Sequence, residues 1–200
     1  MSPLRVGLTG GLASGKSTVG RWLSEAGCEV VDSDRIVAEL YRPGGPGARV
    51  VEALFGAEVL NERGGVDRTR LAERVFADGI ARRRLEQAIH PLVRDQFARI
   101  AADSEGITVL EVPLLVESGM AEAFDVVVTI ESPPEERVAR AVERGLSAEE
   151  ARARIAAQVS PGMRRNASDI VIENDGDLDD LRREVDDLVR RLEALAAEDG

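Results

Sequence analysis

The fold class follows from residues 4–18, Leu-Arg-Val-Gly-Leu-Thr-Gly-Gly-Leu-Ala-Ser-Gly-Lys-Ser-Thr. Residues 4–9 have the continuous apolar pattern of a buried strand, and residues 16–23 have the pattern of a helix that ends at Gly27. Between them, Gly10-x4-Gly15-Lys16-Ser17 matches the complete G-x4-G-K-[ST] pattern of a phosphate-binding loop, or P-loop. Because the motif lies between a strand and a helix, as its chemistry requires, an accidental match in a glycine turn is a poor alternative.

The residue types of this loop each have a chemical reason. Glycines let backbone N–H groups turn towards a β-phosphate, and the helix that follows directs the positive end of its dipole at the same anion. We expect Lys16 to bridge the β- and γ-phosphates and the Ser17 hydroxyl to coordinate Mg²⁺. Lys16 is the only lysine among 26 cationic side chains, which indicates that a planar guanidinium does not suit this position. The predicted nucleotide-binding residues are Gly10, Gly11, Leu12, Ala13, Ser14, Gly15, Lys16, Ser17 and Thr18.

The bulk composition limits the classes of function. A chain of 200 residues with 44% hydrophobic and 32% charged residues is typical of one compact α/β protein with insertions. The net charge of −11 argues against a nucleic-acid-binding surface. No apolar run approaches the roughly 18–20 residues that cross a bilayer, so we expect no membrane partner. The N-terminal residues carry no secretory pattern and Cys28 is the only cysteine, so we expect a cytoplasmic protein. We expect a monomer or a weak homo-oligomer.

The pattern of elements predicts a three-layer α/β/α fold of the P-loop NTPase class, with a five-stranded parallel sheet. The five predicted strands are 4–9, 28–31, 107–112, 125–130 and 169–172. A helix over 177–198, with leucine and valine on one stripe, is expected to pack on this sheet.

Two helical insertions interrupt the predicted sheet. One is almost entirely helical, with a piece that Asp67 caps and whose apolar side carries Leu71, Val75 and Phe76, and with a helix boundary at His90-Pro91. The other contains two arginine-rich helices, the second beginning at a capping box at Ser147. We therefore expect a nucleotide-binding core over 1–41, 105–132 and 166–200, a helical substrate-binding insertion over 42–104, and a small helical lid over 133–165.

Several classes of P-loop protein are excluded by the sequence. A GTPase switch reads guanine with Asn-Lys-x-Asp, and the single lysine is already in the P-loop. Gly10 and Gly11 are adjacent, so the G-x-G-x-x-G pattern of dinucleotide-binding proteins is absent after the first strand. The remaining class is a small-molecule kinase, which needs an acceptor site, a base, and cations that cover the transferred phosphoryl group.

Candidates exist for the base and for the cations. Asp32 and Asp34 follow the second strand, where one carboxylate can accept the proton of an attacking hydroxyl and the other can hold Mg²⁺ through water. The alternative for Asp34 is a structural cap on a helix over 35–40. Arg137, Arg140 and Arg144 recur at helical spacing and could neutralise phosphoryl charge, although for any one of them a solvated or salt-bridged role is the more common one.

The sequence also resembles one family, the dephospho-CoA kinases, over nearly its whole length. The resemblance lies in motifs that occur in the same order: residues 7–18, Val31-Asp32-Ser33-Asp34, His90-Pro91-Leu92-Val93, Val112-Pro113-Leu114-Leu115-Val116-Glu117, the Arg140/Arg144 pair, and Ile172-Glu173-Asn174-Asp175-Gly176. Such enzymes transfer a phosphate from ATP to the 3′-hydroxyl of the ribose of dephospho-CoA, the last step of coenzyme A synthesis.

The resemblance implies roles for particular residues. Asp34 would be the base, with Lys16 and Arg140 as the other catalytic residues, and ATP with Mg²⁺ as cofactors. Arg144 and Asn174 would contact ATP, Asn174 at the adenine. The acceptor pocket would be lined by Asp32, Asp34, His90, Leu114, Leu115 and Glu117, with 42–104 as the CoA-binding domain. Gly145 and Asp175 depart from residues common in the family. Two other interpretations stay open: a kinase for another nucleotide or nucleoside, and a nucleotide-binding regulatory module without turnover.

Overall fold

The computed structural model describes residues 3–76 and 78–198, and the chain folds into two compact units. The first unit contains the residues up to Val31 together with those from Ile100 onward, and the second unit contains Asp32–Arg99. The helical unit therefore differs from the expected insertion, 42–104, at both ends: α2 (Ser33–Leu40) belongs to it, and residues 100–104 belong to the first unit.

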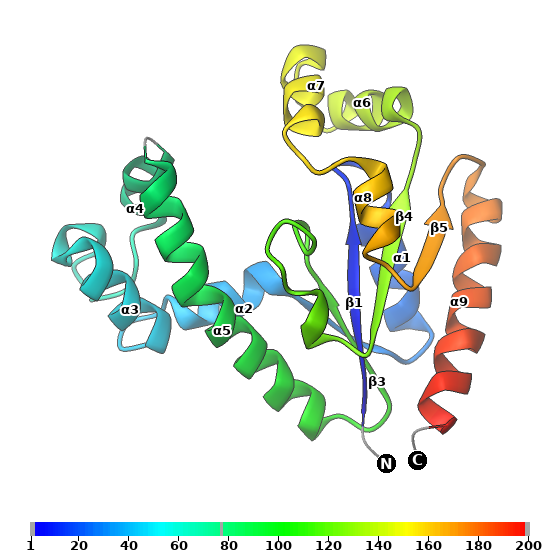
Figure 1. Ribbon diagram of the computed structural model, residues 1–200, viewed down its shortest axis with the longest axis horizontal. Helices are drawn as coiled ribbons and strands as arrows, with labels where there is room; N and C mark the ends of the chain where they lie inside the picture. Colours follow the sequence, from blue (N-terminus) through cyan, green and yellow to red (C-terminus); the bar gives the residue numbers. More distant parts are fainter. Residues whose placement is uncertain (1–2, 77, 199–200) are drawn as a thin grey trace. The chain divides into compact units, whose positions relative to one another are not determined.

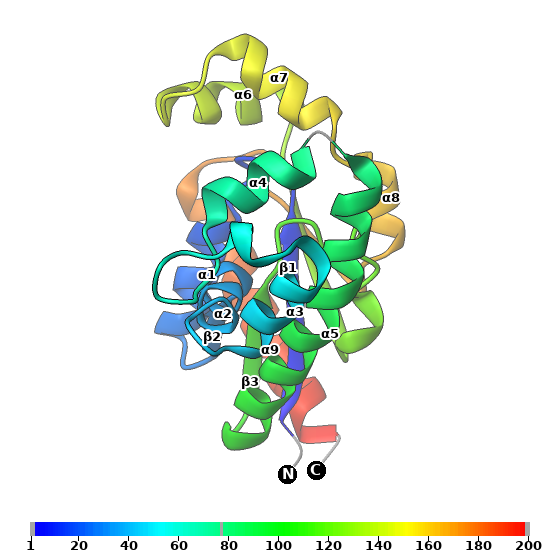
Figure 2. The same cartoon turned by 90° about the vertical axis from the view of Figure 1, so that its left-hand side faces the viewer.

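The first unit is built on a five-stranded sheet with the order β2-β3-β1-β4-β5. Figure 1 labels β1, β3, β4 and β5, and Figure 2 labels β2. Strand β1 (Leu4–Gly10) pairs in parallel with β3 (Ile107–Glu111) and with β4 (Val126–Glu131). Strand β4 pairs in parallel with β5 (Ile170–Glu173), while β2 (Glu29–Asp32) lies beside β3. This confirms the predicted five-stranded α/β fold. In the β1–β3 register Leu8 lies opposite Glu111, so the carboxyl ends of the central strands meet where the P-loop begins.

Helices α1 (Lys16–Glu25) and α9 (Leu178–Glu198) pack against the sheet in one apolar core. The buried stripe of α9 consists of Leu181, Val185, Leu188 and Leu192, spaced by three and four residues. These side chains share a cluster with Val6, Leu8 and Val128 of the strands. This shared cluster confirms the predicted packing of the C-terminal helix on the sheet. The burial of each such side chain contributes about 1.5–3 kcal/mol to stability.

The segment after β4 forms three helices where two were expected: α6 (Pro134–Glu143), α7 (Ala148–Ala156) and the short α8 (Pro161–Asn166). The extra helix begins where the Ser160 hydroxyl accepts a hydrogen bond from the Met163 N–H. The predicted capping box at Ser147 and Glu150 is confirmed. Figures 1 and 2 show α6 and α7 side by side at one end of the first unit. Their shared apolar cluster also contains Ala13 and Leu12, so this region packs directly on the P-loop.

The second unit is helical, with α2, α3 (Pro46–Phe55), the short η1 (Ala57–Val59), α4 (Arg68–Phe76) and most of α5 (Gly79–Asp103). Asp67 caps α4, as expected, since its Oδ1 accepts hydrogen bonds from the N–H groups of Thr69 and Arg70. A second short turn, η2 (Ala121–Ala123), lies in the first unit. None of the helices among the described residues is long and apolar enough to cross a membrane.

Two expectations for the helical unit are wrong. The predicted boundary at His90-Pro91 is absent, because α5 continues through Pro91. An internal proline costs about 3 kcal/mol, but the buried residues Ile89, Val93 and Phe97 continue at a spacing of four on both sides of it, and their burial outweighs that cost. Phe76 is 95% exposed and does not share the apolar side of Leu71. Five residues of α-helix rotate the side chain by about 140° from Leu71, whereas Val75, four residues on, stays near it.

Candidate nucleotide-binding and phosphotransfer site

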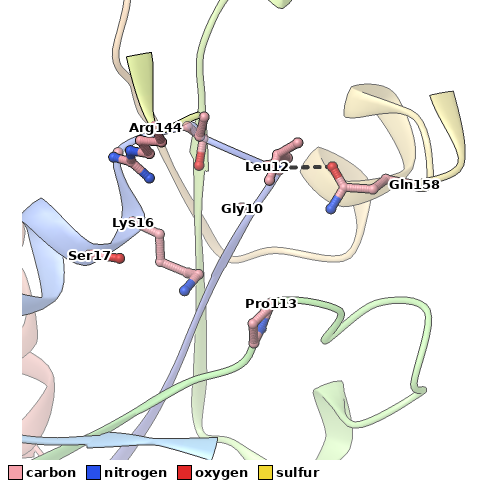
Figure 3. Close-up of a pocket in the computed structure, with 11 residues that line it drawn as sticks. Gly10, Leu12, Lys16, Ser17, Pro113, Arg144 and Gln158 are labelled. Atoms are coloured by element: carbon pink, nitrogen blue, oxygen red, sulfur yellow. Dashed lines mark hydrogen bonds between the residues drawn. The ribbon is translucent and has the colours of Figure 1, made fainter. Parts of the chain in front are cut away.

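The P-loop takes a conformation that its glycines make possible. Gly10 and Gly15 have φ values of 155° and 105°, and Ala13 is the one described non-glycine residue with a positive φ, at 58°. A Cβ atom at Gly15 would overlap the side-chain amide of Asn174, and one at Gly10 would lie 2.6 Å from Ser14 Oγ. The loop encloses a cavity lined by residues 10–17 together with Pro113, Arg144 and Gln158 (Figure 3).

Buried polar atoms of the loop suit an anionic ligand. Ser14 is 1% exposed, and its Oγ has no hydrogen-bond partner among the described residues. An unsatisfied buried hydroxyl costs about 1–3 kcal/mol, which a ligand carrying acceptor oxygens would offset. The Ser14 backbone carbonyl is satisfied, since it accepts a hydrogen bond of 2.8 Å from Asn174 Nδ2. Asn174 therefore supports the loop backbone, and the Ser14 hydroxyl suits a phosphate oxygen.

Lys16 is held by a carboxylate that sequence reasoning did not select. Its Nζ lies 3.1 Å from Glu111 Oε2, and the two side chains are 16% and 15% exposed. Glu111 is the last residue of β3, and the room for its carboxylate comes from Gly20 of α1, where a Cβ would overlap Oε1. The signal in the sequence was a carboxylate that ends an apolar strand just before Pro113. This pair fixes the position of the Lys16 ammonium group beside the end of β3.

The oxygen donors near Lys16 fit a magnesium ion. Ser17 is exposed and lines the cavity, and Glu111 is in contact with the neighbouring lysine. Mg²⁺ in nucleotide sites takes one or two protein oxygens and completes its shell with phosphates and water. Among the described residues there is no group of three or more His, Cys, Asp or Glu that could hold a metal ion.

The arginines predicted for phosphate contact differ in environment. Arg144 is exposed and lines the P-loop cavity (Figure 3). Arg140 is ion-paired within its own helix, with Nη2 at 2.7 Å from Glu136 Oε2, and it donates to Ser132 Oγ at 2.9 Å. Arg137 is 1% exposed and touches the P-loop backbone. Burial lowers the pKa of the Arg137 guanidinium from its ordinary value, and the charge of nearby Arg164 lowers it further, while Glu131 opposes this effect.

Residues expected at ATP and at the acceptor are partly used for structure. Asn174 is 7% exposed and its Nδ2 donates a hydrogen bond to the Ser14 carbonyl, so it supports the loop. Leu115 is fully buried and faces Gly7, so it braces its segment without offering a surface, whereas Leu114 is 39% exposed. The carboxylate of Glu117 accepts a hydrogen bond of 3.1 Å from the Val159 N–H, which ties its segment to the chain after α7.

The two aspartates after β2 have different roles at the start of α2. Asp32 is the N-cap, with Oδ1 accepting a hydrogen bond of 2.8 Å from the Asp34 N–H. The alternative that Asp34 is the cap is therefore wrong. Asp34 lies in the first turn with an exposed side chain. Half-buried His90 lies within α5 of the helical unit.

Comparison with known proteins agrees with this geometry. A sequence model of the dephospho-CoA kinase family matches residues 4–180. A dephospho-CoA kinase of Frankia casuarinae is 44% identical over 197 residues, covering 96% of this chain and 86% of the relative. One from Methylococcus capsulatus is 44% identical, covering 97% and 99% of the two chains.

Solved structures show the same fold. A Thermus thermophilus crystal structure has a TM-score of 0.81 and 34% identity, covering 96% of this chain and 99% of its own. The dephospho-CoA kinase of Campylobacter jejuni has a TM-score of 0.70 and 26% identity over 95% of this chain and 97% of its own. A shikimate kinase of Acinetobacter baumannii, at 16% identity and a TM-score of 0.55 over 94% of this chain and 92% of its own, shares the fold alone. The P-loop, the matched length and these relatives agree: the chain belongs to the dephospho-CoA kinase family.

Proposed function

We propose that the P-loop of this kinase holds the triphosphate of Mg·ATP, and that the γ-phosphate is transferred to the 3′-hydroxyl of the ribose of dephospho-CoA, giving coenzyme A and ADP. The observation that carries the proposal is a complete P-loop whose Lys16 is already oriented by Glu111, in a chain that the family model matches from residue 4 to 180. Oriented charge costs no reorganisation when the transition state forms, which is why such loops accelerate phosphoryl transfer.

The phosphate side of the reaction rests on residues of the first unit. Lys16 leaves Glu111 for the phosphates and neutralises charge that develops on the transferred group. Ser17, with Glu111 close by, would hold Mg²⁺, which when bound neutralises phosphate charge and orients the oxygens. Arg144 lines the same cavity and supplies a second, exposed cation. For Arg140 to assist, its ion pair with Glu136 must open, so we propose Arg144 as the first of the two to meet ATP.

The base is proposed to be Asp34. Its exposed carboxylate makes no hydrogen bond or ion pair among the described residues, while the cap made by Asp32 fixes the backbone from which it projects. Asp34 would accept the proton of the ribose hydroxyl as the oxygen attacks phosphorus. We expect Asp34→Asn to lower kcat by about 10²–10⁴-fold while the Kd for Mg·ATP changes less than about threefold. Single-turnover rates and calorimetric ATP titration measure the two quantities; near-normal turnover would remove Asp34 from the base role.

We propose that the helical unit is the CoA-binding domain, and that the residues that bind the acceptor include His90, Leu114 and Glu117. The test is ADP release from Mg·ATP with and without dephospho-CoA. ADP formation that requires dephospho-CoA supports the proposal, whereas preferential use of a nucleoside monophosphate would favour another kinase specificity. Tight ATP binding without transfer to any acceptor would favour a regulatory module. We further propose a cytoplasmic monomer or weak homo-oligomer that binds no nucleic acid, in keeping with the net charge of −11.

A further inference from the structure

A buried guanidinium touches the P-loop from the side of α6. Arg137 is 1% exposed, its Nε donates to the Leu12 carbonyl at 2.9 Å, and its Nη2 donates to Gln158 Oε1 at 2.9 Å. A Cβ atom at Gly11 would overlap this guanidinium, so the side chain lies directly against the loop backbone. Arginine stays charged in proteins even when burial lowers its pKa.

The charge of Arg137 is not cancelled by its surroundings. Arg137 forms no ion pair with any residue in the described part of the chain, since the nearest buried carboxylate already has a partner. That carboxylate, Glu131, binds Arg164 through Oε1 at 2.5 Å and Oε2 at 3.0 Å, and the two side chains are 3% and 2% exposed. The cluster of Arg137, Arg164 and Glu131 therefore carries a net charge of +1 beside the P-loop.

Gln158 joins this charge to the loop without neutralising it. Its Oε1 accepts a hydrogen bond of 2.9 Å from the Leu12 N–H as well as the one from Arg137, and its side chain lines the P-loop cavity (Figure 3). A glutamate would satisfy the same two donors and would pair with the guanidinium more strongly. The neutral amide keeps the geometry and leaves the positive charge for a ligand.

We propose that Arg137, oriented by Gln158, is a positioning residue that fixes the backbone of Leu12 through its carbonyl and places a permanent positive charge beside the P-loop, and that this charge sets the affinity of the P-loop for nucleoside polyphosphates. The inference rests on the proposed function only in taking the P-loop ligand to be a nucleoside triphosphate. A buried uncompensated charge is costly in the free protein, and a ligand with several phosphate charges offsets that cost. The contribution of the Arg137 charge to nucleotide affinity therefore grows with the number of phosphates on the ligand.

The decisive variant is Gln158→Glu, which keeps both acceptor contacts and cancels the charge. We expect the Kd for Mg·ATP to rise about tenfold and that for AMP to change less than twofold, because the added carboxylate acts through charge. The melting temperature stays at or above that of the wild type, since a buried pair replaces a lone charge. In steady state, KM for ATP rises while kcat at saturating ATP changes less than threefold, a split that a merely structural role would not produce.

Two further variants and a control complete the test. Arg137→Gln is expected to weaken Mg·ATP binding by a similar factor, and Arg137→Lys by less, because it retains the charge. Arg152→Gln removes a charge from the neighbouring helix, where Arg152 is 59% exposed and pairs with Glu135, and should change ATP affinity less than twofold. A folded Gln158→Glu protein that binds Mg·ATP like the wild type would overturn the inference. Binding is measured without an acceptor, so a failure of dephospho-CoA phosphorylation would leave this test intact.

Discussion

Among single residues, Gly20 is a position where helix propensity favours alanine but the geometry of the site requires glycine. Alanine in the middle of a helix is favoured over glycine by about 1 kcal/mol, so Gly20→Ala should stabilise α1. The new methyl group would, however, overlap the Glu111 carboxylate, a flexible group that can move away from Lys16. We expect a melting temperature equal to or above that of the wild type, together with a roughly tenfold loss of kcat/KM for Mg·ATP, because the lysine loses its orientation. Thermal unfolding and steady-state kinetics on one preparation measure both.

The matched control is Gly162→Ala, at a helical glycine whose added Cβ would come no closer than 3.9 Å to a neighbour, Ser160 Oγ. It should stabilise α8 slightly by the same propensity and leave turnover unchanged. If Gly20→Ala has the kinetics of this control, Glu111 does not orient Lys16 for catalysis.

Among the elements, the serine N-caps of α7 and α8 are expected to contribute equally to stability but differently to ATP binding. Ser147 caps α7 at the end remote from Gln158, while Ser160 caps α8 two residues after it. Loss of an N-cap costs about 1 kcal/mol, so Ser147→Ala and Ser160→Ala should each lower the melting temperature by about 2–4 °C. Only Ser160→Ala should also raise KM for ATP, about threefold, because it loosens the segment that holds Leu12. Equal KM values in the two variants would contradict this division.

The elements also show what the sequence could and could not predict. The sequence predicts the P-loop and the strands because their signals lie in adjacent residues, and it predicts α9 because its apolar residues recur at a spacing of three and four. The boundary at Pro91 was wrong because the burial of Ile89, Val93 and Phe97, which lies outside any local rule, outweighs the cost of the proline. The Lys16–Glu111 pair joins residues 95 positions apart, and the Leu12–Gln158 bond joins residues 146 positions apart. Such pairs depend on sheet register and helix packing, and the periodicity of apolar residues in the sequence predicts neither.

At the scale of the whole molecule, the helical unit is inserted in the sequence between β2 and β3, and every residue that lines the P-loop cavity belongs to the first unit. A ligand that binds only the folded site raises the free energy of every opening that destroys this site. At a ligand concentration of 100 Kd the increase is about 2.7 kcal/mol. Local opening of the inserted helices does not require the sheet to unfold. Mg·ATP should therefore raise the free energy of opening in β1, β3 and β4 by about 2.7 kcal/mol, while α3 and α4 change by less than about 0.5 kcal/mol.

Amide hydrogen exchange with and without Mg·ATP measures this difference strand by strand. Lys16→Ala is the control, because loss of the lysine weakens ATP binding and should remove the protection of the strands while the exchange of the free protein stays near that of the wild type. If α3 and α4 gain as much protection as the strands, the two units unfold as one cooperative body.

Adding dephospho-CoA to the Mg·ADP form tests the acceptor assignment by the same measurement. New protection in α3, α4 or α5 is expected only if the helical unit binds the acceptor. The absence of such protection would mean that the acceptor binds elsewhere.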